Sequence, residues 1–455
     1  MTSDVVTPSP GTEATTRPPG PLDQPPAGGP VPARGAASAA DRVAPLITSL
    51  FGDRPPIRFE FWDGSALGAV DGPGTVLVRS PNVIRRLLWS PGELGLARAY
   101  LTGELQMEGD IFSVLATLHG AAPADLKVGA RFPLLALRAA GRLGVLRPPL
   151  PRPAEEALPR GRRHSKARDA EVISHHYDIS NEFYRLVLGP SITYSCARYV
   201  NETDTLEAAQ QAKLDLVCRK LGLPDRPGAR LLDVGCGWGS MALHAARHYD
   251  AQVVGVTLSR AQAELARQRV TEEGLEGQVE IRVQDYRDLR GEQFDVISSI
   301  GMFEHVGAEK MAQYFETLYG LLSDTGRLLN HAISSVGGSR ITRRSFIGRY
   351  VFPDGELMDV SRVAQGMEHA GFEVRDVESL REHYAKTLRA WVANLQDNWD
   401  GAVAEVGVQR ARVWLLYMAA SANGFEDGGI SLHQVLGVKT DPHGQSLMPL
   451  TRRGW

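Results

Sequence analysis

The feature that most constrains the fold is a regular alternation of short apolar runs with longer amphipathic runs between residues 206 and 333. The short runs have the length and β-branched content of buried strands, and the longer runs have helical spacing. The predicted strands cover residues 230–235, 252–257, 279–284, 294–299 and 326–333, and the predicted helices cover residues 206–223, 241–249, 260–274 and 309–322. Strands that alternate with helices form a mostly parallel sheet covered on both faces. We therefore predict an α/β protein with a doubly wound sheet that binds ligands at the carboxyl ends of its strands.

Composition divides the rest of the chain into further units. Residues 1–40 are mostly Pro, Gly, Ala, Ser and Thr, so this segment cannot bury enough apolar surface to offset the entropy of ordering, and we expect a disordered tail. Residues 41–145 mix strand-like and helix-like runs, including a helix over residues 93–105, and predict a small α+β domain. A basic linker, residues 146–170, then leads to the α/β domain, residues 171–455.

The sequence around this linker leaves two interpretations open. FPLLALRAAGRLGVLRPPLPRP (residues 132–153) has an apolar face with arginines beside it, and PRGRRHSKAR (residues 159–168) is basic. Such a segment is either a solvated linker or a membrane-surface patch attracted to anionic lipid headgroups. Gly141 and Gly144 weaken the prediction of a helix here.

Bulk properties exclude several classes of protein. A net charge of −3 gives no general attraction to nucleic acid, and three cysteines suit a reducing compartment better than a disulfide framework. The sequence contains neither a run of about 18 apolar residues nor a secretory signal pattern. We expect a cytoplasmic protein whose membrane contact, if any, is peripheral and at the inner face of the cell membrane.

LLDVGCGWGS (residues 231–240) has the pattern of a strand, a glycine-rich turn and the start of a helix. Gly235 and Gly237 allow a ligand to approach the backbone closely. The G-x-G-x-G spacing, and a next strand that ends in VTLS instead of an acidic residue, argue against a dinucleotide site. Asp233 before the glycines is similar to the S-adenosylmethionine site of class I methyltransferases, although it could also be a structural carboxylate that binds loop amides.

Two further motifs follow predicted strands. In DYRDL (residues 285–289), Tyr286 is placed to stack on an adenine ring, with Asp285 or Arg287 at the edge of the ring; an ordinary surface loop is an equal alternative for Arg287. In SIGMFEHVG (residues 299–307), a carboxylate, Glu304, and an imidazole, His305, follow a buried strand. If the backbone there is extended, these two neighbours point in opposite directions, so we expect His305 to be structural.

Taken together, the motifs carry a specific resemblance. SHHYDISNEFYRLVLGPSITYSCARY (residues 174–199), LLDVGCGWGS, GVTLS, SIGMFEHVG, HAI and EHYAKTLRAW (residues 382–391) resemble the cyclopropane-fatty-acyl-phospholipid synthase family. The resemblance covers about residues 42–440. It implies a class I methyltransferase fold and transfer of the S-adenosylmethionine methyl group to the double bond of an acyl chain. That reaction passes through a carbocation, so it needs a dry site, aromatic faces and a base.

The resemblance also implies individual roles. A bound bicarbonate is the implied base, and the residues that match its holders are Cys196, Glu304, His331, Ile333 (through its backbone) and Tyr384. The matching and motif-based cofactor residues are Tyr194, Ser195, Asp233, Gly235, Gly237, Thr257, Leu258, Gln262, Asp285, Tyr286, Arg287 and Ile300. The segment of His175, Tyr177 and Asp178 is expected to close over the cofactor. Tyr350 and Phe352 are candidate walls for the acyl chain, with core packing an equal alternative.

The FIGRYVFPDGEL and AEVGVQRARVW stretches are similar to an actinobacterial branch of this family. In that branch a 1,2-hydride shift and proton loss give a 10-methylene chain, which a flavin- or NADPH-dependent reductase converts to a 10-methyl chain. A cyclopropane product from the same cation is the alternative. The chain departs from the family at Ser180, Glu182 and residues 358–360.

Two functions outside lipid methylation are weaker hypotheses for the same sequence. A methyltransferase for a soluble substrate would explain the glycine-rich loop but would leave Cys196, Glu304, His331 and Tyr384 without a role. A non-catalytic lipid-binding protein would have no need of these residues either. The expected partners are a phospholipid surface and a second copy of the chain, with no nucleic acid.

Overall fold

The computed structural model describes residues 37–121, 132–157, 163–166, 168–169, 179–338, 341–342 and 345–455. Residues 1–36 of the expected tail, and His175, Tyr177 and Asp178, lie outside these ranges. The first helix, α1 (Ala39–Phe51), begins inside the range expected for the tail. It begins there because Ser38 and Asp41 form a reciprocal capping box at its N-terminus.

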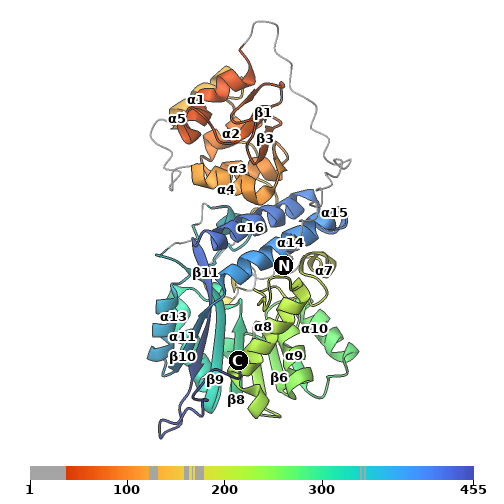
Figure 1. Ribbon diagram of the computed structural model, residues 1–455, viewed down its shortest axis with the longest axis vertical. Helices are drawn as coiled ribbons and strands as arrows, with labels where there is room; N and C mark the ends of the chain where they lie inside the picture. The colour runs from red at the N-terminus through yellow and green to blue at the C-terminus, as the bar shows by residue number, and fades with distance from the viewer. Residues whose placement is uncertain are drawn as a thin grey trace, which may run out of the picture.

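The N-terminal unit is a small mixed sheet covered by helices (Figure 1). Its strand order is β2-β1-β3-β4, formed by β1 (Arg58–Phe61), β2 (Ala66–Leu67), β3 (Gly74–Val78) and β4 (Leu105–Gly109). The helices after α1 are α2 (Asn82–Trp89), α3 (Glu93–Leu101), α4 (Ile111–Ala121) and α5 (Phe132–Arg142). The helix predicted over residues 93–105 is too long, because Gly103 turns the chain at a φ of 76° and Leu105 starts a strand paired with β3.

The described part of the linker packs on this unit, so it is not a free solvated linker. The Trp89 indole nitrogen donates a hydrogen bond to the Arg147 carbonyl, and Arg85 donates to the Pro148 carbonyl. Further along, Arg98 of α3 forms a bidentate ion pair with the buried Glu156. These contacts hold residues 147–156 along α2 and α3.

The larger unit is built on a seven-stranded sheet of order β10-β11-β9-β8-β5-β6-β7. Its strands are β5 (Arg230–Val234), β6 (Gln252–Thr257), β7 (Val279–Val283), β8 (Phe294–Ile300), β9 (Leu322–Ser335), β10 (Glu373–Ser379) and β11 (Ile430–Val438). β7, β6, β5, β8 and β9 pair in parallel, and β11 pairs antiparallel to both β9 and β10. The predicted α/β class and mostly parallel sheet are confirmed; β10 and β11 were not predicted.

Helices cover both faces of this sheet (Figure 1). One face carries α8 (Leu206–Leu221), α9 (Ser240–Tyr249) and α10 (Arg260–Glu272), and the other carries α11 (Met311–Leu321) and α13 (Val360–His369). α8 is bounded as the sequence suggests, because the Thr205 hydroxyl caps its first turn and Gly222, at a φ of 80°, ends it.

A helical layer lies between the sheet and the N-terminal unit (Figure 1). It contains α7 (Asn181–Leu188), α12 (Phe346–Tyr350), α14 (Arg381–Asp397), α15 (Trp399–Val406) and α16 (Val408–Glu426). One continuous apolar cluster runs from Val43 of α1 through Trp414 of α16 to Leu432 of β11. Within the described residues, no helix combines the length and apolarity needed to cross a bilayer.

Candidate active site

The glycine-rich loop has the backbone geometry that close ligand approach requires. It joins β5 to α9, and Gly235 and Gly237 have φ values of 77° and 55°, which side chains other than glycine rarely adopt. A Cβ atom on Gly235 would also lie 3.0 Å from Met302. The Gly235 amide donates to the Val256 carbonyl, so the loop is held against the end of β6.

A cavity of about 1190 Å³, counted to its open mouth, lies above this loop at the carboxyl ends of the strands. All of the predicted cofactor residues line it, namely Tyr194, Ser195, Asp233, Gly235, Gly237, Thr257, Leu258, Gln262, Asp285, Tyr286, Arg287 and Ile300. We call it the cofactor cavity. Residues far apart in the sequence thus meet where the parallel topology predicts a ligand site.

Asp233 has an environment that differs from that of a carboxylate bound to loop amides. The side chain is 2% exposed, and its Oδ1 accepts a hydrogen bond of 2.8 Å from the Ser298 hydroxyl. Its Oδ2 has no partner, and among the described residues no loop amide donates to the carboxylate. Burial raises the pKa of Asp233 to about 6. The free oxygen therefore lines the cavity as an acceptor that the protein itself does not satisfy.

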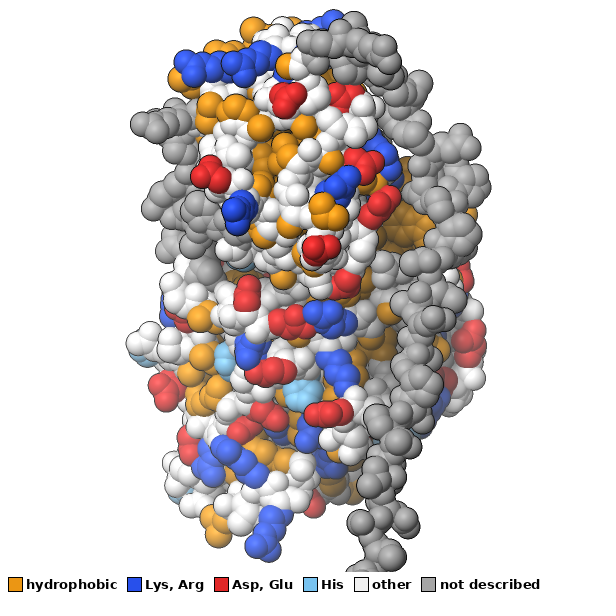
Figure 2. All heavy atoms as spheres, turned by 45° about the horizontal axis from the view of Figure 1, so that its top comes forward, with side chains coloured by type: hydrophobic (Ala, Val, Ile, Leu, Met, Phe, Trp, Pro, Cys, Tyr) orange, Lys and Arg blue, Asp and Glu red, His pale blue; other side chains and the backbone are white. Residues whose placement is uncertain are grey.

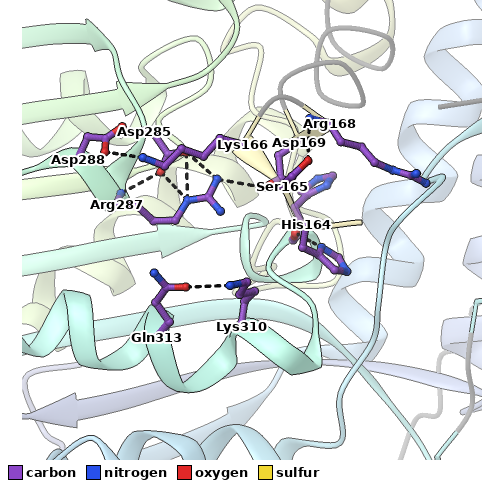
Figure 3. Close-up of polar contacts among 11 residues, drawn as sticks. His164, Ser165, Lys166, Arg168, Asp169, Asp285, Arg287, Asp288, Lys310 and Gln313 are labelled. Atoms are coloured by element: carbon purple, nitrogen blue, oxygen red, sulfur yellow. Dashed lines mark hydrogen bonds and ion pairs between the residues drawn. The ribbon is translucent and has the colours of Figure 1, made fainter. Parts of the chain in front are cut away.

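The edge expected to hold adenine is closed by an ion-pair network (Figure 3). Arg287, in a short 3₁₀ turn (Tyr286–Asp288), pairs with Asp285 at 2.6 Å and with Asp169 at 3.0 Å. Lys166 pairs with Asp288 at 2.5 Å, so Lys166 and Asp169 are both tied to this turn. With 13% of its side chain exposed, Arg287 does not belong to an ordinary surface loop. Asp285 and Arg287 pair with each other, and Tyr286 lines the cavity beside them.

A second cavity, of about 920 Å³ with the open space at its mouth included, adjoins the first. All of the residues predicted to hold the base line it, namely Cys196, Glu304, His331, Ile333 and Tyr384. The rest of its lining is mostly aliphatic and aromatic, including Ile341, Ile347, Phe352, Leu357, Leu388, Tyr417 and Phe425. We call it the acyl cavity because its lining suits a hydrocarbon chain. Tyr350 does not line it; its hydroxyl donates to Glu156 instead.

Glu304 is the acidic residue in the described lining of the acyl cavity. It is 8% exposed, and its Oε1 accepts a hydrogen bond of 2.7 Å from the Ile333 amide. The Ile333 backbone is therefore engaged by Glu304, where the family resemblance had predicted direct contact with the base. Glu304 Oε2 is buried and has no partner. Burial raises the pKa of Glu304 to about 7, so protonated and ionised forms coexist near neutral pH.

His331 and Cys196 are both neutral groups. His331 on β9 is 1% exposed, and burial holds its pKa well below the usual value. The Gln434 side-chain nitrogen contacts His331 Nδ1 at 3.2 Å; as an amide donor it places the ring proton on Nε2, which has no partner. The fully buried Cys196 donates its thiol proton to the Ala197 carbonyl, and burial raises its pKa. Both side chains are therefore donors and not charged nucleophiles.

The two cavities share a wall formed by Tyr194, Ser195, Gly301 and His305. The opposite directions expected for Glu304 and His305 were wrong, because both residues line the acyl cavity, while the structural role expected for His305 stays a prediction. Residues Phe303–His305 form a 3₁₀ turn in place of an extended strand end, and His305 lines both cavities. Burial lowers the pKa of His305 to about 4, so it too is neutral. The Tyr194 hydroxyl donates to the Tyr417 hydroxyl at 3.1 Å, which braces the wall from the acyl side.

Some residues of the site were missed in the sequence. Lys213 and Gln210 of α8 are both fully buried, and Lys213 lines the cofactor cavity. A signal was present, because Lys213 and Lys220 stand seven residues apart on the same side of α8 as apolar residues. Tyr417 of α16 gave no signal, since the C-terminal helices were not predicted.

The chain is similar to several known proteins along most of its length. The family model described as "Mycolic acid cyclopropane synthetase" matches residues 164–435. A "Probable fatty acid methyltransferase" from Mycobacterium tuberculosis is 45% identical over 412 residues, which cover 88% of this chain and 94% of that protein. The cyclopropane-fatty-acyl-phospholipid synthase of Escherichia coli K12 is 36% identical over 374 residues, which cover 81% of this chain and 89% of that protein. The solved structure of the mycolic acid cyclopropane synthase CmaA1 with SAH and CTAB is 36% identical, with a TM-score of 0.56 over 59% of this chain and 98% of that one.

Proposed function

The chain belongs to the mycolic acid cyclopropane synthetase family, and from that premise we propose that it methylates the double bond of an unsaturated fatty acyl chain in a membrane phospholipid. Family membership supports S-adenosylmethionine-dependent methyl transfer to a fatty acyl lipid. The observation that supports the finer proposal is that the same four residues line both cavities. A methyl donor bound in the polar cavity would therefore lie next to an acceptor bound in the apolar one.

The protein's own groups suit this reaction. S-adenosylmethionine supplies an electrophilic sulfonium methyl group, whereas an isolated alkene is a weak nucleophile that leaves a carbocation after attack. The apolar lining of the acyl cavity excludes water, which would trap that cation. The rings of Phe352, Tyr417 and Phe425 line the cavity and can stabilise positive charge through their faces. The phenol oxygen of Tyr417 is a weak nucleophile, because burial raises its pKa to about 12 and keeps it protonated.

A bicarbonate ion fits the polar end of the acyl cavity. Glu304 Oε2 and His331 Nε2 are both buried there without partners. An oxyanion that carries one proton can donate to Glu304 and accept from His331, and the Tyr384 side chain lines the same cavity. When bound, such an ion would supply a proton acceptor. The raised pKa of Glu304 reduces repulsion between the carboxyl group and the anion, because part of the Glu304 population is protonated.

The first candidate product is the 10-methylene chain, on the resemblance of the FIGRYVFPDGEL segment to the methyl-branching members of the family. In this route the methyl group adds to one alkene carbon, and a hydride moves from that carbon to the cationic neighbour. Loss of a proton from the new methyl group then gives the exocyclic methylene. A reductase that supplies hydride would convert it to a methyl branch. The second candidate, a cyclopropane, is favoured by identity to the Escherichia coli enzyme and forms by ring closure before any shift.

Peripheral membrane contact, at the inner face of the cell membrane, forms part of the proposal. The exposed face of α5 carries Leu134 and Leu137, which are 47% and 43% exposed, beside exposed Arg138. Trp89, 53% exposed, lies on α2, which packs against α5. Figure 2 shows hydrophobic side chains interspersed with Lys, Arg, Asp and Glu over the upper part of the molecule, where the N-terminal unit lies. Apolar groups flanked by cations suit an anionic lipid interface.

The test is expression in a bacterium that makes monounsaturated phospholipids and has no such methyltransferase of its own. Mass spectrometry of the fatty acids should show chains heavier by one CH₂ group at the expense of the monounsaturated chains. NMR of the purified acid then separates methylene from cyclopropane. A matched culture with the Glu304→Gln variant controls for endogenous chemistry. An unchanged profile from folded protein that binds S-adenosylhomocysteine would refute lipid methylation.

A further inference from the structure

Helix α8 carries two buried lysines with different environments. Lys213 and Lys220 are each 1% exposed and lie seven residues apart. Lys220 is neutralised, because it pairs with Asp376 at 2.9 Å and also with Glu378. Lys213 forms one hydrogen bond, of 2.8 Å to the Ser195 hydroxyl, and no ion pair with any described residue. Lys213 and Asp233 attract each other, but they form no direct ion pair. A buried ammonium group without a directly bound counter-charge is costly, so its position favours an anion beside it.

The cofactor cavity is the place for this anion, because Lys213 lines it and does not line the acyl cavity. Asp233 lines the same cavity, and its Oδ2 has no partner. Burial lowers the pKa of Lys213 to about 8 and raises that of Asp233 to about 6, and the attraction between the two groups offsets these shifts only in part. A ligand that carries both charges would therefore stabilise both charged forms. The cavity thus presents one unpaired cation and one unpaired carboxylate oxygen.

We propose that Lys213 binds the carboxylate at the methionine end of S-adenosylmethionine, while Asp233 Oδ2 accepts from its ammonium group. This end is the only part of the cofactor that carries a negative and a positive charge close together, which matches the two unpaired groups. The inference rests on the S-adenosylmethionine part of the proposed function and does not depend on which lipid product forms.

The same contact positions the methyl donor. The Gln210 side-chain nitrogen donates to the carbonyls of Thr193 and Ser195, at 3.3 Å and 2.9 Å, and Lys213 holds the Ser195 hydroxyl. One turn of α8 therefore fixes the segment that forms the shared wall. Anchoring the amino-acid end against this turn directs the sulfonium toward that wall.

The test compares two ligands by isothermal titration calorimetry on the full chain. The first is S-adenosylhomocysteine, and the second is its analogue without the carboxylate, the 3-aminopropyl thioether of 5′-thioadenosine. A buried charge-assisted contact predicts that the wild type prefers S-adenosylhomocysteine by about 30-fold. In Lys213→Met the preference should fall below about threefold, because the methionine side chain has neither a charge nor a hydrogen-bond donor for the carboxylate of S-adenosylhomocysteine.

Lys220→Met is the matched control, since it removes an equally buried lysine on the same helix. It should keep the wild-type preference even if it lowers the melting temperature. If circular dichroism shows that Lys213→Met is unfolded, Lys213→Gln is used instead, because glutamine keeps a hydrogen-bond donor for Ser195. The preference for S-adenosylhomocysteine should be lost in this variant as well. Equal binding of the two ligands by the wild type, or an unchanged preference in the Lys213 variants, would overturn the inference. Failure to bind S-adenosylhomocysteine at all would instead contradict the proposed cofactor.

Discussion

The cofactor cavity and the acyl cavity adjoin each other, but the polar groups that line them differ in charge. The cofactor cavity holds charges, either paired as in Arg287 with Asp285 or left open as in Lys213 and Asp233. The acyl cavity holds titratable groups that burial keeps neutral or half-neutral, among them Glu304, His331 and Cys196. Under the proposed function, a charged ligand would find counter-charges in the first cavity, whereas a carbocation in the second would meet neutral donors and aromatic rings. The following predictions test this division.

The largest expected effect belongs to Glu304→Gln. The substitution removes the acid of the acyl cavity without adding bulk, and the loss of an acid–base group predicts a fall in product formation of about 10³-fold. Affinity for S-adenosylhomocysteine should stay within about twofold by calorimetry, because Glu304 does not line the cofactor cavity. A parallel loss of cofactor affinity would show that the two cavities are not separate.

The same residue predicts a pH-dependent difference in stability. The pKa of Glu304 is about 7 in the folded protein, above the value of 4.5 for a free glutamate. A raised carboxyl pKa means that the folded state binds more protons, so stability is lost as the pH rises between these values. Glu304→Gln lacks this penalty. The free energy of unfolding of the variant, relative to that of the wild type, should therefore rise by up to about 3 kcal/mol between pH 4.5 and 8.

Thermal denaturation across that pH range provides the measurement. The difference in melting temperature between Glu304→Gln and the wild type should be small at pH 4.5 and should grow steadily toward pH 8. A constant difference would mean that Glu304 has an ordinary pKa and is solvated.

Gly235→Ala should act on the cofactor cavity instead. Its φ of 77° strains any residue with a Cβ, and the added atom meets Met302 at 3.0 Å. The strain predicts binding of S-adenosylhomocysteine that is weaker by about tenfold. Product formation should recover when S-adenosylmethionine is raised in proportion, which would not happen for Glu304→Gln. Gly237→Ala, where a Cβ meets nothing within 4 Å, separates backbone strain from the contact with Met302.

The smallest expected effect is at the shared wall. Tyr194→Phe removes one hydrogen bond to the Tyr417 hydroxyl and leaves the ring in place. The loss of about 1 kcal/mol predicts a change of about fivefold, divided between cofactor affinity and product formation. Tyr417→Phe, measured in the same assays, should match the effect on product formation and spare cofactor affinity, since Tyr417 lines the acyl cavity and not the cofactor cavity.

The parts of the site that follow strand ends were predictable from the sequence. The apolar strands and the loop at Gly235 depend on local patterns, and the parallel topology then brings their ends together. The acyl cavity depended on the family resemblance, because Cys196, His331 and Tyr384 carry no local signal of a common site. The position of His305 was mispredicted, since a 3₁₀ turn is not distinguishable from a strand end in four residues of sequence. The pairing of Arg287 with Asp169 joins distant segments and has no local signature.

The contact of α8 with residues 193–196 has a consequence for how this architecture can vary. Ser195 lines both cavities, and the next residue, Cys196, lines only the acyl cavity. The lining thus changes from both cavities to the acyl cavity alone within one peptide unit, about 3.8 Å between Cα atoms. A one-residue insertion or deletion there would shift which residues line each cavity, whereas α14 and α16 supply residues to the acyl cavity and not to the cofactor cavity. Substitutions in these two helices can therefore reshape the acyl cavity while the residues that line the cofactor cavity stay the same.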